Sequence, residues 1–246
     1  MSYHWNWSIL NSLVPSGETT YLGWMLEGLK TTVALSLSAW LLALAAGILM
    51  GTLRTVPSRP ARLLASAWVE VFRNIPLLVQ LFIWYFVLPE LLPASIGDAY
   101  KQMNPLLQQF LAAWVCLGLF TSARVCEQVR SGIESLPPGQ KNASLALGFT
   151  LPQTYRFVLL PMALSIVVPP LTSEFLNVFK NSAVCSTIGL LELAAQGRQL
   201  VDYTAQPYES FIAVTLLYLA INVVVMLLMG RVEAKARVPG YMGGGH

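Results

Sequence analysis

The chain has 246 residues, of which 55% are hydrophobic and only 11% carry a charge. Soluble domains carry about 25% charged residues, so this composition excludes an ordinary soluble protein and indicates a membrane protein. The net charge of +3 is small and its carriers are scattered, which argues against a nucleic-acid-binding protein.

Five apolar segments are long enough to cross a hydrocarbon core of ~30 Å. These spans are expected at residues 31–53, 63–92, 106–129, 157–178 and 211–230. The predicted fold class is an all-α polytopic membrane protein. Its expected parts are an N-terminal segment over residues 1–30, one transmembrane domain over 31–237 and a tail over 238–246.

The distribution of positive charge predicts the orientation of these spans. Most Lys and Arg residues lie between spans one and two, after span three, and after span five. Acidic residues predominate in the other connections. The positive-inside rule therefore predicts an external N-terminus and a cytoplasmic C-terminus.

The first span contains Gly47 and Gly51, a GxxxG pair that allows another helix to approach closely. The pair is common in apolar segments and identifies no specific partner.

Polar residues in the second span require an explanation, because charge inside a membrane is costly. Glu70, Arg73 and Gln80 fall close to one face of a continuous helix, and Pro76 favours a kink. One interpretation is a polar path in which Arg73 binds a carboxylate. The alternative is a Glu70–Arg73 ion pair that only fixes the bend, and the sequence favours neither.

The third span ends in a polar helical face. We interpret this face mainly as a solvated, salt-bridged helix end, with contact to a cytoplasmic partner as the alternative. The face is formed by Arg124, Glu127, Gln128, Ser131 and Glu134.

The connection over residues 139–161 has the pattern of two short helices separated at Gly148. Thr150 is a suitable N-cap for the second helix, and Pro152 suits its first turn. Such a hairpin on the cytoplasmic side is suited to docking another protein. It favours a partner-driven transporter over a self-contained channel.

The fourth span is predicted to break at Pro169 and Pro170, which would expose backbone groups that line a cavity. Glu174, Asn177 and Asn181 share one face of this span, and Lys180 is turned away from it. The substrate-path candidates in the two spans are therefore Glu70, Arg73, Gln80, Glu174, Asn177 and Lys180. A kinked structural helix and a snorkelling Lys180 remain the alternative.

Residues that carry enzyme chemistry are scarce. The only histidines, His4 and His246, stand near the chain ends, and the three cysteines are widely spaced in apolar surroundings. No P-loop, metal-ligand spacing or nucleophile motif is present. The sequence predicts no catalytic residue, no metal ligand and no cofactor bound by this chain, so any ATP must be hydrolysed by another subunit.

The 139–161 connection resembles the EAA loop of permease subunits of binding-protein-dependent ABC importers. That family pattern is EAA, three residues, Gly, nine residues, Ile, one residue, and Leu-Pro. The matching residues here are Asn142, Ala143, Ser144, Gly148, Val158, Leu160 and Pro161. Departures are Asn142 for Glu, Ser144 for Ala and Val158 for Ile. The resemblance implies that this set, with Gly139 at the start of the loop, couples the permease to an ATPase.

Other segments are similar to the polar amino-acid subgroup of these permeases, namely residues 69–82, 123–140 and 168–189. The chain ends and their flanks are similar to a permease subunit of a glutamate/aspartate importer. The resemblance implies import of a polar amino acid, with glutamate or aspartate favoured, across the bacterial inner membrane. It also implies four partners: an ABC ATPase dimer that binds ATP and Mg, a second and non-identical permease subunit, a periplasmic amino-acid-binding protein and membrane lipid.

The competing hypothesis is a secondary amino-acid transporter driven by an ion gradient through Glu70, Glu174 and Lys180. Such transporters usually contain internal repeats, and the two halves of this chain are not convincingly similar.

Overall fold

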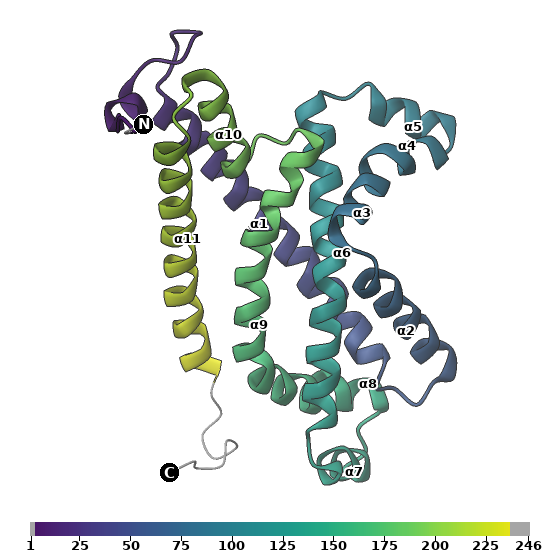
Figure 1. Ribbon diagram of the computed structural model, residues 1–246. Coiled ribbons are helices and arrows are strands. Elements are labelled where there is room, and N and C mark those ends of the chain that lie inside the picture. The colour runs from purple at the N-terminus through teal and green to yellow at the C-terminus, as the bar shows by residue number, and fades with distance from the viewer. Residues whose placement is uncertain (1–2, 237–246) are drawn as a thin grey trace. The chain divides into compact units, whose positions relative to one another are not determined.

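The computed structural model describes residues 3–236 (Figure 1). Within these residues the secondary structure is helical, apart from one isolated bridge between Leu13 and Thr20. Four of the described helical segments are long and apolar enough to span a membrane. The pair Arg59–Asn74 and Leu77–Leu91 adds a fifth if it counts as one span. The predicted all-α polytopic class is confirmed. The predicted tail, residues 238–246, lies outside the described residues.

The long helices are α1 (Tyr21–Leu53), α6 (Pro105–Glu134), α9 (Leu160–Ser182) and α11 (Pro207–Ala236). The shorter α-helices are α2 (Arg59–Asn74), α3 (Leu77–Phe82), α4 (Leu88–Leu91), α5 (Ala94–Lys101), α7 (Pro138–Ala146), α8 (Leu151–Thr154) and α10 (Leu193–Thr204). The 3₁₀ turns are Trp7–Asn11 and Ala183–Ile188, and the π turns are Ile83–Val87 and Tyr155–Leu159.

The first long helix includes part of the predicted N-terminal segment. α1 begins at Tyr21, whereas the first span was expected to begin at residue 31. The side chain of Thr20 accepts a hydrogen bond from the backbone N–H of Gly23 (3.1 Å), which caps the helix. Glu27 and Lys30 form an exposed ion pair at 2.6 Å one turn apart within this helix. Hydropathy alone did not reveal the polar first turns of α1.

The described residues form two compact units. Unit 1 comprises residues 3–39, 76–117 and 177–224, and unit 2 comprises residues 40–75, 118–176 and 225–236. Each of the four long helices contributes residues to both units.

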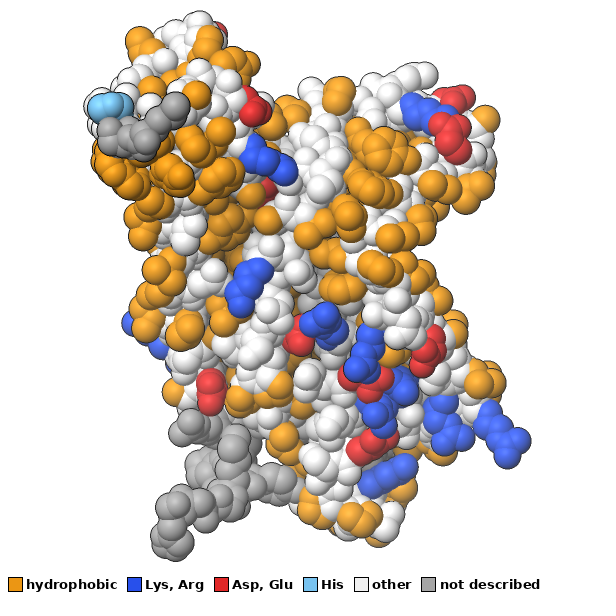
Figure 2. Space-filling view, in the orientation of Figure 1, with side chains coloured by type: hydrophobic (Ala, Val, Ile, Leu, Met, Phe, Trp, Pro, Cys, Tyr) orange, Lys and Arg blue, Asp and Glu red, His pale blue; other side chains and the backbone are white. Residues whose placement is uncertain are grey.

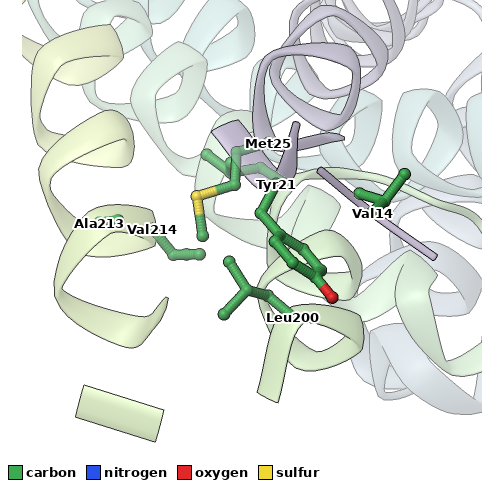
Figure 3. Packing of buried hydrophobic residues seen from close by; sticks show 7 residues of the cluster. Val14, Tyr21, Met25, Leu200, Ala213 and Val214 are labelled. Carbon is green, nitrogen blue, oxygen red and sulfur yellow. The ribbon is translucent and has the colours of Figure 1, made fainter. Parts of the chain in front are cut away.

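A buried hydrophobic cluster organises unit 1 (Figure 3). It joins the N-terminal segment, α1, α10 and α11, and its members are Val14, Tyr21, Met25, Leu193, Leu200, Ala213 and Val214. Met25 and Leu193 have no exposed surface. Burying a side chain of this size contributes about 1.5–3 kcal/mol, so this cluster fixes the start of α11 against α10.

Close packing of α1 against α6 organises unit 2. A Cβ atom added at Gly47 would lie 2.5 Å from Val125 Cβ and 2.9 Å from the carbonyl oxygen of Ser122. A Cβ atom at Gly51 would lie 2.8 Å from the carbonyl oxygen of Cys126. The predicted role of the GxxxG pair in close helix approach is confirmed, and the helix it admits is α6 of the same chain.

The second span is interrupted at Ile75 and Pro76. Ile75 is extended (φ −85°, ψ 129°), because a residue before proline is disfavoured in the helical region, and α3 restarts at Leu77. The expectation that Glu70, Arg73 and Gln80 share one helical face is therefore wrong. Glu70 and Arg73 belong to α2, whereas Gln80 lies beyond the break in α3.

The expected break at Pro169 and Pro170 is also wrong, because α9 continues through both residues. A proline inside a helix costs about 3 kcal/mol. Val167 and Leu171 are buried on either side of the two prolines. The hydroxyl of Thr172 also donates to the carbonyl of Val168 (3.2 Å). The cavity that was inferred from broken backbone is not supported here.

Two π turns also depart from regular α-helical hydrogen bonding in the described spans. The N–H of Leu88 bonds to the carbonyl of Ile83, and the N–H of Leu160 bonds to the carbonyl of Tyr155. In each case the next residue is a proline, Pro89 or Pro161. The wider turn leaves room for the proline ring beside the preceding carbonyl groups.

Candidate coupling hairpin and substrate hollow

The predicted two-helix hairpin is present in unit 2. α7 ends at Ala146, the chain turns at Gly148, and α8 starts at Leu151 (Figure 1). Gly148 has φ +88°, a left-handed conformation that residues with a side chain rarely adopt. The expected cap is confirmed as a capping box. Thr150 Oγ1 accepts from the N–H of Gln153 (3.5 Å), and Gln153 Oε1 accepts from the N–H of Thr150 (2.8 Å).

Buried hydrogen bonds hold the hairpin together and attach it to unit 2. Ser144 Oγ lies 3.2 Å from Thr154 Oγ1, and both side chains are buried. Ser144 also donates to the carbonyl of Lys141 (2.8 Å). The hydroxyl of Tyr155 donates to the carbonyl of Thr55 (2.8 Å), at the turn that follows α1. The hairpin is therefore hydrogen-bonded to the α1–α2 connection.

The outer surface of the hairpin is apolar as well as exposed. Leu147 is 80% exposed, and Leu145 and Phe149 are 41% and 40% exposed. A patch of large apolar side chains beside a polar loop is typical of a protein-binding surface. The side chains of Asn142 and Ala143 are exposed on the same helix.

The other predicted coupling residues occupy different environments. Gly139 is exposed in the first turn of α7, Leu160 is half-buried, and Pro161 is exposed at the start of α9. Ser144 is only 4% exposed. Its side chain therefore stabilises the hairpin from inside and is not part of the outer surface. The contacts of all these residues with an ATPase remain a prediction.

A charged hollow of about 350 Å³ lies elsewhere in unit 2. Its lining is Arg73, Arg124, Glu127, Gln128 and Glu174. Arg124 Nη1 lies 3.6 Å from Glu174 Oε2, and the Arg124 guanidinium lies 5.2 Å from the centre of the Phe120 ring. Glu174 Oε2 is buried and has no hydrogen-bond partner within residues 3–236. Figure 2 shows basic and acidic side chains gathered over α2 and this part of α6.

Glu127 holds one wall of the hollow in place. It accepts from Arg54 at the end of α1 and from Nε of Arg130 (3.1 Å), and Arg130 also binds Glu134 (2.8 Å). Of the face predicted for the end of span three, Glu127 and Glu134 do form ion pairs within α6, but their partner is Arg130, and Arg124, Glu127 and Gln128 line the hollow. Sequence reasoning did not identify Arg124 as a lining residue, because its partner Glu174 lies on a different helix.

The predicted path residues are only partly brought together. Arg73 and Glu174 line the same hollow. Glu70 is exposed and accepts from Asn74 Nδ2 (2.5 Å), so the predicted Glu70–Arg73 pair is not among the ion pairs that the described residues form. Gln80 is buried in unit 1, where Asn177 is half-buried and Lys180 is exposed. Among residues 3–236, no group of three or more His, Cys, Asp or Glu side chains could hold a metal ion.

A buried carboxyl group in unit 1 was missed by the sequence reasoning. Glu192 has no exposed surface and precedes α10, where its carboxylate accepts from the N–H groups of Ala194 (3.0 Å) and Ala195 (2.8 Å). The hydroxyl of Tyr218 donates to the same group (2.7 Å). Burial raises the pKa of the Glu192 carboxyl, although these hydrogen bonds oppose the shift. An acidic residue just before a helical pattern was the available signal for this cap.

The helical spans, the hairpin and the charged hollow are the features of a membrane permease driven by a partner protein. Residues 43–238 match the family described as the binding-protein-dependent transport system inner membrane component. The chain therefore belongs to this family of ABC importer permeases. It is a non-catalytic, multi-pass subunit of the inner membrane, and a separate ATPase subunit hydrolyses ATP.

Two curated relatives are similar over most of the chain. The glutamate/aspartate import permease protein GltJ of Escherichia coli K12 is 56% identical over 245 residues, which are 99% of this chain and 100% of GltJ. The probable glutamine ABC transporter permease protein GlnM of Bacillus subtilis 168 is 32% identical over 210 residues. These cover 85% of this chain and 92% of GlnM.

Solved structures share the fold. A crystal structure of an amino acid ABC transporter with histidines matches with a TM-score of 0.72 and 29% identity, covering 87% of this chain and 95% of that one. An inward-facing MetNI methionine ABC transporter matches with a TM-score of 0.73, covering 88% and 98% of the two chains. Its identity is 22%, so this second likeness supports the fold alone.

Proposed function

We propose that this chain is the permease subunit through which an ATP-driven importer moves glutamate or aspartate across the inner membrane. The observation that carries the proposal is the charged hollow, whose lining includes Arg73, Arg124 and Glu174. The likeness to GltJ over almost the whole chain supports the same substrates.

The charges around the hollow complement an acidic amino acid. Glutamate and aspartate each carry two carboxylates and one ammonium group. Arg73 and Arg124 offer two guanidinium groups, each able to bind a carboxylate through two parallel hydrogen bonds. Glu174 offers a carboxylate for the ammonium group. The other path candidates, Glu70, Gln80, Asn177 and Lys180, do not line this hollow and remain predictions.

The α7–α8 hairpin would receive the mechanical input from the ATPase. Leu147 and Phe149 supply an exposed apolar surface, and Gly148 provides the turn between the two helices. Gly139, Asn142, Ala143, Leu160 and Pro161 complete the proposed coupling set. The distribution of positive charge supports a cytoplasmic hairpin and an external N-terminus. The proposed partners are an ABC ATPase dimer, which binds ATP and Mg, a non-identical second permease subunit, a periplasmic amino-acid-binding protein and membrane lipid.

Transport would follow from a two-state change of the complex. ATP binding to the ATPase must favour one state, and the hairpin must transmit that preference to the spans. The bond between Tyr155 and Thr55 gives the hairpin a direct link to the α1–α2 connection. A change at the hairpin can therefore alter the position of α2, which carries Arg73.

Uptake by proteoliposomes with enclosed ATP tests the proposal. Inverted membrane vesicles are unsuitable, because their exposed face is the cytoplasmic one, whereas the binding protein acts from the periplasmic face. We expect labelled glutamate and aspartate uptake to need both ATP and the binding protein, and to survive a proton uncoupler. Arg124→Lys should reduce uptake about tenfold, since it keeps the charge and loses the fork geometry. Arg62→Lys, on the exposed face of α2, is the matched control. Uptake that persists without ATP and fails with the uncoupler would instead favour an ion-coupled secondary transporter.

A further inference from the structure

The N-terminal residues 3–11, here called the strap, display a set of exposed aromatic rings that the proposed transport mechanism does not use. Trp5 and Trp7 are 58% and 45% exposed, and Tyr208 at the start of α11 is 54% exposed. The Trp5 and Trp7 rings stack with their centroids 6.0 Å apart and their planes within 3°. The Tyr208 ring lies 5.9 Å from that of Trp5, so the three rings form one aromatic patch.

Specific hydrogen bonds fasten the strap to the first turn of α11. The hydroxyl of Tyr3 donates to Glu209, and the backbone N–H of Asn6 donates to Oε1 of the same residue (2.6 Å). Tyr3 Oη also lies 2.6 Å from Gln206 Oε1, and its ring packs edge-on against Tyr208 at 4.5 Å. Glu209 is completely buried beneath these contacts. The aromatic patch therefore has a fixed position at the end of a membrane span.

The aromatic patch continues into the apolar outer face of α11. Phe211, Leu216 and Leu219 are 49%, 57% and 57% exposed along this helix. A hollow of about 250 Å³ starts beside the aromatic patch, and it is lined by Pro207, Tyr208, Phe211, Ile212, Thr215 and Leu216. In Figure 2, hydrophobic side chains dominate the surface around the strap and the start of α11. α11 is long and apolar enough to cross a membrane, so an acyl chain is the natural occupant of such a surface.

The chemistry of the strap fits the boundary between headgroups and acyl chains. No Lys, Arg, Asp or Glu occurs in residues 3–17, whereas the rings combine an apolar body with a polar N–H or O–H group. Indole and phenol rings concentrate at this depth of a bilayer. Residues 3–42 lie outside the range matched by the permease family, so the strap is not assigned by that match.

We propose that the strap is a lipid-binding element. Its aromatic patch lies at the headgroup boundary of the leaflet that surrounds the start of α11. The hollow below it holds a phospholipid acyl chain, and the Tyr3–Glu209 contact fastens the strap to α11. In the proposed orientation this is the outer leaflet of the inner membrane.

Tryptophan quenching in the assembled importer, held in lipid nanodiscs, tests this proposal. The signal of the aromatic patch is the difference in emission between the parent and the Trp5→Phe/Trp7→Phe variant, which keeps aromatic rings at both positions. Phospholipids brominated near the glycerol end of the acyl chain should quench this difference signal at least about twofold more than lipids brominated near the methyl end. The matched control is the difference in emission obtained in the same way when Trp40 is replaced by Phe. Trp40 is buried against Phe175 in unit 2, so its signal should be insensitive to iodide in the water.

Two results would contradict the proposal. A patch signal that iodide quenches and neither brominated lipid affects would place the rings in water and overturn the proposal. A signal that becomes protected only when the purified binding protein is added would assign the aromatic patch to that protein instead.

A second variant tests the fastening of the strap. Tyr3→Phe removes the hydroxyl that donates a hydrogen bond to Glu209, so quenching by the shallow brominated lipid should decrease. Tyr203→Phe, which alters an exposed tyrosine on α10, should leave it unchanged. Equal quenching in the parent and Tyr3→Phe would overturn the role of the Tyr3–Glu209 contact in positioning the strap.

Discussion

The α7–α8 hairpin and the α10 segment are both short helical regions connected to long spans, but they differ in the exposure of their apolar side chains. The hairpin leaves Leu145, Leu147 and Phe149 exposed. The α10 segment buries Leu193 and Leu200 in the core of unit 1 and satisfies the Glu192 carboxylate with its own backbone. An exposed apolar surface requires another molecule to cover it, whereas a buried one is complete within the chain.

Glycine has a different purpose in each region. Gly148 has a positive φ and no atom within 4 Å of an added Cβ, so it is required by backbone conformation. Gly28 faces the start of α10, where an added Cβ would lie 3.0 Å from Leu193 Cα and 3.1 Å from the carbonyl carbon of Glu192. It is required by space. Substitutions in the hairpin should therefore damage coupling, and substitutions beside α10 should damage folding.

The largest effect is expected for Gly148→Asp. A side chain at φ +88° strains the turn, so the hairpin should lose its geometry and uptake should fall to background while insertion into the membrane is normal. Glutamate uptake, binding-protein-stimulated ATP hydrolysis and membrane content would be measured together. Gly17→Asp is the matched control, because Gly17 also has a positive φ (+74°) and open space around it. Normal transport-linked ATP hydrolysis by Gly148→Asp would remove the coupling hypothesis.

Gly28→Val should instead reduce stability. The backbone of α10 cannot move away from the new side chain without disturbing the unit 1 cluster, so the expected cost is about 1–3 kcal/mol. The thermal unfolding midpoint of the purified complex would measure this cost. Gly230→Val provides the control, because no atom lies within 4 Å of a Cβ added at Gly230. Equal midpoints for the two variants would contradict the tight α1–α10 contact.

Arg73→Lys extends the comparison between exposed and buried groups to a charged side chain that lines the hollow. It should reduce glutamate uptake about tenfold, which corresponds to about 1.4 kcal/mol, because lysine cannot reproduce the guanidinium fork. Thermal stability should not change, since Arg73 is exposed and lines the hollow rather than the core. Unchanged uptake would leave Arg73 with a structural role near the break in the second span.

The smallest effect is expected from a substitution of Glu192, a buried charged residue in contrast to the exposed Arg73. This substitution should change the pH dependence of stability. The pKa of Glu192 in the folded chain is raised above the ordinary value of 4.5, so the folded state binds the proton more tightly than the unfolded state. This contribution to stability is fully present below about pH 4.5 and is lost as the pH rises through the folded pKa, at about 1.4 kcal/mol for each pKa unit of displacement.

Glu192→Gln should therefore flatten the pH dependence of the unfolding midpoint above pH 4.5, the ordinary pKa of this group. Glu27→Gln alters an exposed carboxylate on α1 and should leave the pH dependence as it is. A pH profile of Glu192→Gln that is identical to the parent profile would show that burial does not shift this group.

Periodicity and hydropathy predicted the parts of the fold that depend on local chemistry. Long apolar runs revealed the spans, and Thr150 revealed the cap of α8, because a cap depends on only a few neighbouring residues. The two proline sites show where such reasoning ends. Pro76 interrupts its span and Pro169–Pro170 do not, so the presence of a proline does not by itself predict where a membrane helix breaks.

The candidate site also contains one part that the sequence predicted and one that it did not. The hairpin could be predicted because its residues are consecutive, and a resemblance over consecutive residues is visible in one sequence. The hollow could not, because Arg73, Arg124 and Glu174 come from three different helices. The strap was equally hidden, since its anchor Glu209 lies more than two hundred residues from Tyr3 in the chain.

The amino-acid sequence by itself determined that this protein is a helical membrane protein with a two-helix hairpin, because composition, hydropathy and capping act over short stretches of chain. The resemblance of that hairpin to the EAA loop indicated a permease. Only the tertiary structure decided which charged groups share a hollow, which prolines interrupt a helix and which carboxylates are buried. Those outcomes depend on contacts between distant segments, and the free energy of such contacts exceeds the local preferences from which a sequence is interpreted.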